Sequence, residues 1–254
     1  MRHHTLEEDD PELTDLAASV GRGEAIEVSR CSFRSLLRGG TFTAPPVVAP
    51  PRDPHAFLLR ATARLHRRLD HTPVMARLMA ADCSIEDYCS AMTGLLWAYQ
   101  RVDVALLHAS VYQPPEMPAY APRSPRLWLD LAALQQPAQR WTRPQDFLLV
   151  AFPAVDSRAS YLGMRYVIEG AQQGSRFIRR ALAQSLGEQL SRVGKFWAPE
   201  VPWHAHWPAN LAQLTELSDS TALVAAARAA RRTFRHFIAC LEQAPVYQSQ
   251  EVHL

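Results

Sequence analysis

The sequence predicts an all-α protein, folded as a helical bundle with partly irregular connections. From Pro54 onward, apolar residues recur at helical intervals in one segment after another. No segment shows the long alternation of apolar and polar residues that a half-buried strand requires. Proline-rich stretches separate the helical segments, as expected at helix ends because proline lacks the backbone donor.

Two parts of the chain differ in character. Residues 1–53 are mixed polar and end in a proline-rich run, with five prolines between positions 45 and 54. We interpret 1–53 as an N-terminal extension with a semi-rigid linker, and 54–247 as the helical domain.

The first predicted helix runs through "HAFLLRATARLHRRLDH". Pro54 suits its first turn. A second helix, about 84–110, starts at Ser84, with Asp87 three residues later as in a capping box. The positions expected to face the core are Phe57, Leu58, Ala61, Leu65 and Leu69 in the first helix and Tyr88, Met92, Leu95, Leu96, Tyr99, Val102, Leu106 and Leu107 in the second.

Three further helices are predicted downstream. A short one covers "RLWLDLAAL", and a longer one, about 157–187, carries several glycines. An irregular segment at "KFWAPEVPWHAHWP" precedes a last helix of about 209–243. In that segment, His204 and His206 lack nearby acidic or cysteine partners, so packing is a better interpretation than a metal site.

Composition excludes several classes of function. The 254 residues are 48% hydrophobic with a formal net charge of +2, which gives no reason to expect a nucleic-acid partner. No run of about 18 apolar residues exists, so no membrane span is predicted. The acidic start lacks the apolar stretch of a secretory signal, and the four cysteines form no CxxC pattern. We therefore expect a cytoplasmic location.

The glycine-bearing helix raises a question about Gly163, Gly170 and Gly174. Each interior glycine costs a helix about 1 kcal/mol relative to alanine. Small residues at such spacing allow a close approach to the backbone. Another helix packing there is the commoner explanation, and a flat ligand against the main chain is the other.

His66 is the candidate ligand on the first helix. It shares a helical row with Thr62 and Leu69, at the edge of the apolar face. Asp70 follows one turn later, and a histidine that binds a metal usually donates its other N–H to a carboxylate or carbonyl. A surface His–Asp contact would have the same spacing.

Together these two helices resemble the heme oxygenase family, in particular its bacterial, phytochrome-associated branch. The segment "LLRATARLHRRLD" is similar to the family's proximal helix, and "YVIEGAQQGSRFI" to its distal pattern of Tyr-Val-Leu-Glu-Gly with a second glycine four residues later. The resemblance covers about residues 54–245, with weaker similarity at "GKFW", Trp207 and "AARRTFRHFIACL".

The resemblance implies a site and a reaction. Heme would lie between the proximal helix and a kinked distal helix, with His66 as the axial ligand of the iron. The residues implied in heme binding are Thr62, Asp70, Tyr166 and Phe234, and those implied in catalysis are Gly170, Gly174 and Ser175. The reaction would open the heme ring to biliverdin, carbon monoxide and iron. Electrons would come from an external reductant such as ferredoxin or flavodoxin with its reductase, and a bacterial phytochrome is a candidate user of the product.

Two departures from the family keep a second interpretation open. Leu59 stands where animal-type members have a basic residue that pairs with a heme propionate, and Ala171 stands where they have an aspartate. The candidate cations for the propionates are Arg176, Arg179, Arg180, Arg231 and Arg232. The alternative is a non-catalytic member of the same fold that binds heme, a bilin or another protein.

Overall fold

The structure is a computed structural model and describes residues 53–134, 152, 154–198, 205–217 and 219–247. Within these ranges every regular element is a helix, so the predicted all-α class is confirmed. The extension predicted for residues 1–53 lies outside the described residues except for its last residue, Asp53.

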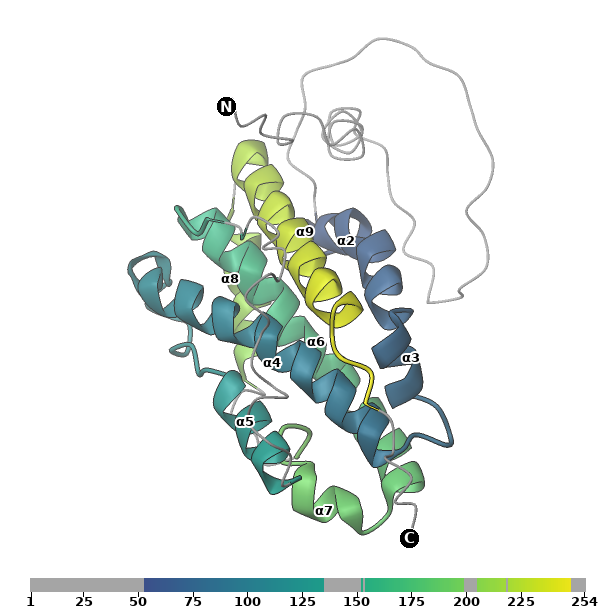
Figure 1. The fold of residues 1–254 in the computed structure, drawn as a ribbon. Helices are drawn as coiled ribbons and strands as arrows, with labels where there is room; N and C mark the ends of the chain where they lie inside the picture. The colour runs from purple at the N-terminus through teal and green to yellow at the C-terminus, as the bar shows by residue number, and fades with distance from the viewer. Residues whose placement is uncertain (1–52, 135–151, 153, 199–204, 218, 248–254) are drawn as a thin grey trace, which may run out of the picture.

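The described elements are α2 (Pro54–Asp70), α3 (Pro73–Leu78), α4 (Ile85–His108), the 3-10 helix η1 (Ser110–Tyr112), α5 (Ser124–Ala133), α6 (Arg158–Leu186), α7 (Gln189–Val193), α8 (His206–Thr215) and α9 (Ser220–Glu242). The long helices α4, α6 and α9 form the centre of the bundle, and the others flank them (Figure 1). α9 packs against α6, α2 and α4, while α5 packs against α4 and α8 packs against α6.

Helix starts follow the local sequence closely. Pro54 stands in the first turn of α2, where the Asp53 side chain accepts from the Ala56 amide at 3.1 Å. Ser84 and Asp87 cap α4 reciprocally, as their spacing predicted. These caps satisfy backbone donors that have no partner inside the helix.

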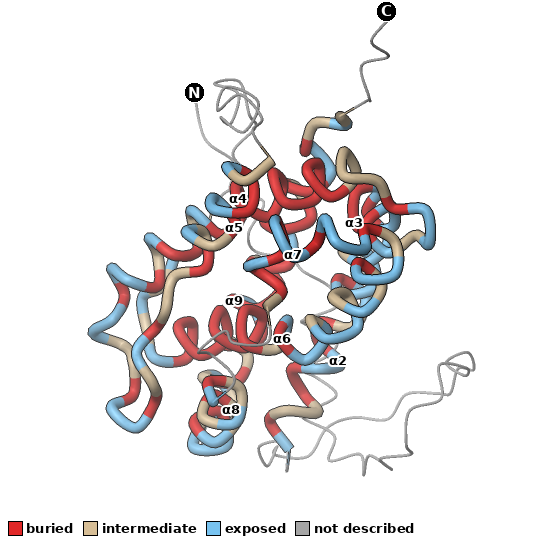
Figure 2. Tube along the Cα trace, turned by 90° about the horizontal axis from the view of Figure 1, so that it is seen from below, coloured by how far each residue is buried: buried red, intermediate tan, exposed pale blue. Residues whose placement is uncertain are grey.

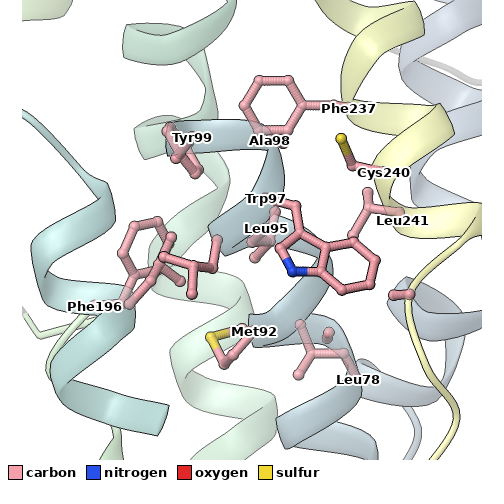
Figure 3. Close-up of a cluster of buried hydrophobic side chains, with 14 of the residues drawn as sticks. Leu78, Met92, Leu95, Trp97, Ala98, Tyr99, Phe196, Phe237, Cys240 and Leu241 are labelled. Carbon is pink, nitrogen blue, oxygen red and sulfur yellow. The ribbon is translucent and has the colours of Figure 1, made fainter. Parts of the chain in front are cut away.

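Buried residues concentrate on α4, α6 and α9 (Figure 2). The larger of two core clusters joins these helices to α3, α5 and α7, and part of it surrounds Trp97, Met92 and Phe237 (Figure 3). The second cluster joins α2, α6, α8 and α9 and includes Leu58, Tyr166 and Phe234. Both helices of interest for ligand binding, α2 and α6, therefore share one core cluster.

Three details of the sequence prediction were wrong. The last helix, predicted over 209–243, is two helices, because α8 ends at Thr215 and Asp219 caps a new start by accepting from the Thr221 amide at 3.0 Å. The start of α8 also lies in the segment predicted to be irregular. Leu107 is 48% exposed, because Asp103 and Leu106 take the inward-facing positions of the same turn.

One glycine of α6 is explained by helix packing. A Cβ at Gly163 would lie 2.7 Å from the carbonyl carbon of Ala226 and 2.9 Å from its Cα. Both are main-chain atoms of α9, so no side chain fits there. For Gly163 the packing interpretation is the correct one.

Among the described helices, none is long and apolar enough to cross a bilayer.

Candidate functional site

α2 and α6 lie against α9 and run in the same direction as α9 (Figure 1). Two polar contacts between α2 and α9 show that these two helices run in parallel. Arg231 donates to the Ala61 carbonyl at 2.6 Å, and further along Arg68 pairs with Glu242 at 2.9 Å. α2 is therefore held to α9 at two levels.

α2 and α6 meet through a polar contact between Thr62 and Tyr166. The Thr62 side chain lies beside the Tyr166 hydroxyl and partly offsets the effect of burial on the pKa of that phenol. Thr62 donates its own proton to the Leu58 carbonyl at 2.8 Å. Burial raises the pKa of Tyr166 to about 12, so the phenol remains a neutral donor.

One helical turn beyond this contact lie His66 on α2 and Gly170 on α6. Each is four residues past the contact residue of its helix, so it projects from the same side. His66 also touches α9, with its ring centroid 5.6 Å from that of Phe234. The structure thus places His66 beside Phe234, and Thr62 beside Tyr166 one turn earlier.

His66 has the carboxylate partner that its spacing predicted. Its Nδ1 lies 3.0 Å from Asp70 Oδ2, and its side chain is 60% exposed. The hydrogen bond to Asp70 raises the pKa of His66, against a smaller opposing effect of burial. Of the residues described, none hydrogen-bonds to Nε2, so this nitrogen is open to a ligand.

Gly170 and Gly174 meet different surroundings. A Cβ at Gly170 would lie 3.2 Å from the ring of Trp207, which belongs to α8. The Trp207 ring also lies 5.3 Å from that of Tyr166 and 5.6 Å from that of His55. At Gly174 no described atom lies within 4 Å of the Cβ position. Main chain is therefore open at Gly174 and covered by an indole at Gly170.

The burial of α6 changes at Gly170. Residues 161–169 are buried without exception, whereas Gly174, Arg176 and Phe177 are exposed. Ser175 donates its hydroxyl proton to the Gln172 carbonyl at 2.7 Å. α6 continues as one α-helix from Arg158 to Leu186.

The candidate cations for the propionates fall into two groups. Arg231 is buried and bonded to α2, so it is removed from the candidates. Arg179 donates to the Trp197 carbonyl at 3.4 Å, and Arg176 and Arg180 are exposed on α6. Arg232 is half-buried on α9.

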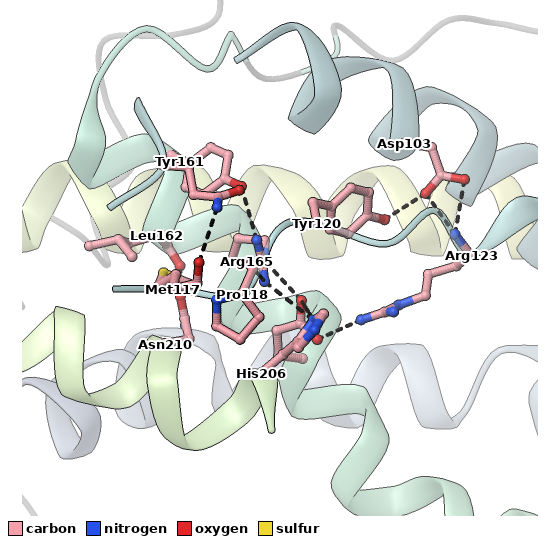
Figure 4. Close-up of polar contacts among 12 residues, drawn as sticks. Asp103, Met117, Pro118, Tyr120, Arg123, Tyr161, Leu162, Arg165, His206 and Asn210 are labelled. Carbon is pink, nitrogen blue, oxygen red and sulfur yellow. Dashed lines mark hydrogen bonds and ion pairs between the residues drawn. The ribbon is translucent and has the colours of Figure 1, made fainter. Parts of the chain in front are cut away.

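A buried ionic cluster, which the sequence analysis missed, forms around Glu169, the residue before Gly170; Figure 4 shows its members Arg123, Arg165 and His206. The Glu169 carboxylate accepts from Arg123 Nη2 at 2.6 Å and from Arg165 Nε at 2.7 Å, and His206 Nδ1 lies 3.5 Å away. Both arginines and the glutamate have no exposed side-chain surface. Burial alone raises the pKa of Glu169, but the His206 hydrogen bond and the two arginine charges outweigh it and hold that pKa below its usual range.

One sequence signal could have revealed this cluster. Arg165 and Glu169 stand four residues apart inside the most apolar part of α6, where charged residues occur only when they are paired. Arg123, on the other hand, lies 46 residues away in a proline-rich loop, and nothing in its local sequence indicates burial.

No group of three or more His, Cys, Asp or Glu side chains in the described part of the chain could hold a metal ion. A single histidine suffices for heme, because the porphyrin supplies the other nitrogens. Searches for similar proteins found no matching family model and no matching curated protein.

Proposed function

We propose that the chain is a heme oxygenase that opens heme to biliverdin, carbon monoxide and iron with electrons from an external reductant. The observation that carries the proposal is the bare main chain at Gly174. Its glycine costs α6 about 1 kcal/mol, and no packing in the described residues accounts for it. A flat ligand against the helix would account for it.

His66 would hold the heme iron from the opposite side. Its Nε2 is open, and Asp70 keeps the other ring nitrogen engaged at 3.0 Å, which fixes the orientation of the imidazole. Thr62, Tyr166 and Phe234 would line the inner end of the site, because Phe234 packs against His66, and Thr62 and Tyr166 lie together one turn before His66 and Gly170.

The exposed main chain at Gly174 leaves room for such a ligand. Beyond the helix's own neighbouring residues, no described atom lies within 4 Å of the Gly174 Cβ position. Bound heme supplies the oxygen chemistry, while the protein binds it, orients it and limits access to one face. Ser175 and ordered water are candidates for moving protons, since Ala171 provides no carboxylate.

Hemin titration tests the proposal. The purified protein should develop a sharp Soret band with hemin, and His66→Ala should abolish or shift it. Gly174→Leu should prevent binding, whereas Ala183→Leu, an exposed position of the same helix, should not. Gly170→Leu should also prevent binding, although that change additionally displaces Trp207.

The enzyme itself is tested by adding oxygen and a ferredoxin-type or chemical reductant. The Soret band should then bleach and a bilin spectrum should appear. Heme that stays bound without bleaching would reject the oxygenase.

A second candidate function is heme or bilin binding without turnover. Ala171 is exposed and apolar at a position where a carboxylate would organise water, and Leu59, 55% exposed, offers no charge to a propionate. Stoichiometric hemin binding with no product would favour this function, and the same chain would then serve a bacterial phytochrome or another partner as a carrier.

A further inference from the structure

α6 and α8 meet at two consecutive residue pairs. Glu169 on α6 lies 3.5 Å from His206 on α8, and the next residues, Gly170 and Trp207, pack against each other with 3.2 Å between the Cβ position and the ring. Glu169 and His206 are therefore each next in sequence to a residue of the contact that covers Gly170.

The start of α8 depends on this contact. Its N-cap residue, Ala205, makes no side-chain hydrogen bond to the first turn. An uncapped first turn leaves backbone donors without partners and is weakly held. His206, the first residue of α8, is nonetheless 5% exposed, and its Nδ1 lies 3.4 Å from Arg165 Nη2 and 3.5 Å from the Glu169 carboxylate. The ionic cluster therefore fastens the end of α8 that the cap does not.

Glu169 is itself rigidly held. Arg165 comes from the same helix, while Arg123 comes from the start of α5, where Asp103 accepts from the Arg123 amide at 3.1 Å. Two arginines, Arg123 and Arg165, thus lie among two acidic side chains, Glu169 and Asp103, so the positive and negative charges are equal in number. A carboxylate with two charged partners inside the protein has little freedom to move.

We propose that Glu169 is a positioning residue that fixes Trp207 against Gly170 through His206, and so sets the inner wall of the ligand site. The positioning of Trp207 stands on the contacts above. Only the effect on the ligand rests on the proposed heme function. An ordinary buried ion pair would only stabilise the fold. A positioning role predicts, in addition, that a substitution of Glu169 changes the surroundings of one indole, that of Trp207.

Fluorine NMR of protein labelled with 5-fluorotryptophan tests the positioning without any ligand. The chain has six tryptophans, and Trp207→Phe identifies the resonance of interest. Glu169→Gln, and separately His206→Ala, should shift or broaden that resonance and leave the resonance of Trp97, deep in the other core cluster, in place.

Asp130→Asn is the matched control. It alters a buried acid that accepts from the Tyr88 hydroxyl and from the Lys195 and Phe196 amides, and that touches neither Glu169 nor α8. Asp130→Asn should lower stability without moving the Trp207 resonance. An unchanged Trp207 resonance in both Glu169→Gln and His206→Ala would overturn the proposal, and so would an equal change in Asp130→Asn.

Hemin titration of the same variants tests the effect on the ligand. Glu169→Gln and His206→Ala should weaken hemin binding by about tenfold, as expected for residues that act through a neighbour. Wild-type affinity in both variants would overturn the claim about the inner wall. If the wild type binds no hemin while the resonance still moves, the heme function fails and the positioning role stands.

Discussion

Gly163 and Gly174 provide a controlled comparison, since both lie in α6 and can receive the same methyl group. In a helix interior, Gly→Ala gains about 1 kcal/mol. At Gly174 the methyl meets no described atom within 4 Å, so we expect nearly the full gain. At Gly163 it would lie 2.7 Å and 2.9 Å from main-chain atoms of Ala226, which cannot rotate away. Overpacking of this kind costs about 1–3 kcal/mol or more, and we expect a net loss on the order of 2 kcal/mol.

Urea unfolding followed by circular dichroism measures both effects. Gly174→Ala should raise the midpoint and Gly163→Ala should lower it, with a difference of about 3 kcal/mol between the variants. Hemin titration adds the functional half, because the more stable Gly174→Ala protein should bind hemin less tightly. Equal stability of the two variants, or a loss of stability in Gly174→Ala, would refute the reasoning. Either result would mean that both glycines are packed alike.

Two other substitutions and one pH titration have predictable results. Glu169→Ala should lower the free energy of unfolding by about 3–5 kcal/mol, measured by denaturant unfolding, because it leaves two buried arginines without their shared carboxylate. Asp130 is buried, and burial raises its pKa to about 6, so its carboxyl carbon should titrate near pH 6 in NMR. The folded state favours its protonated form, and its contribution to stability should therefore decrease as the pH rises through 6. Asp70→Asn should lower the pKa of His66, observable in its imidazole resonances, since the Asp70 hydrogen bond is what raises it. That pair stabilises the fold in acid and loses its effect as the pH rises through the raised pKa, by under about 1 kcal/mol because both groups are exposed.

Local patterns predicted most of the helices. Apolar periodicity and capping residues placed α2 and α4 within two residues of their ends. The break between α8 and α9 was missed because leucines and alanines recur at helical spacing on both sides of it, as they would in one helix. The signal was nevertheless present, since Asp219 precedes a helical run as an N-cap residue does.

In the candidate site, contacts within one helix could be predicted from the sequence, whereas contacts between distant segments could not. Spacing of four residues predicted the His66–Asp70 pair, because both partners lie on one helix. Spacing could not distinguish Gly163 from Gly174, since the difference depends on where α9 lies. The partner of Glu169 on α5 was equally hidden, because a contact across 46 residues leaves no periodic trace.

The two halves of α6 differ in a way that matters for any molecule that docks there. Residues 161–169 are buried in the bundle, whereas most of residues 170–186 are at least partly exposed and continue the same helix. Continuity with the anchored half spares the open half the cost of nucleating a helix. A docking molecule would meet a surface that is already ordered, and would lose little affinity to the entropy of arranging it.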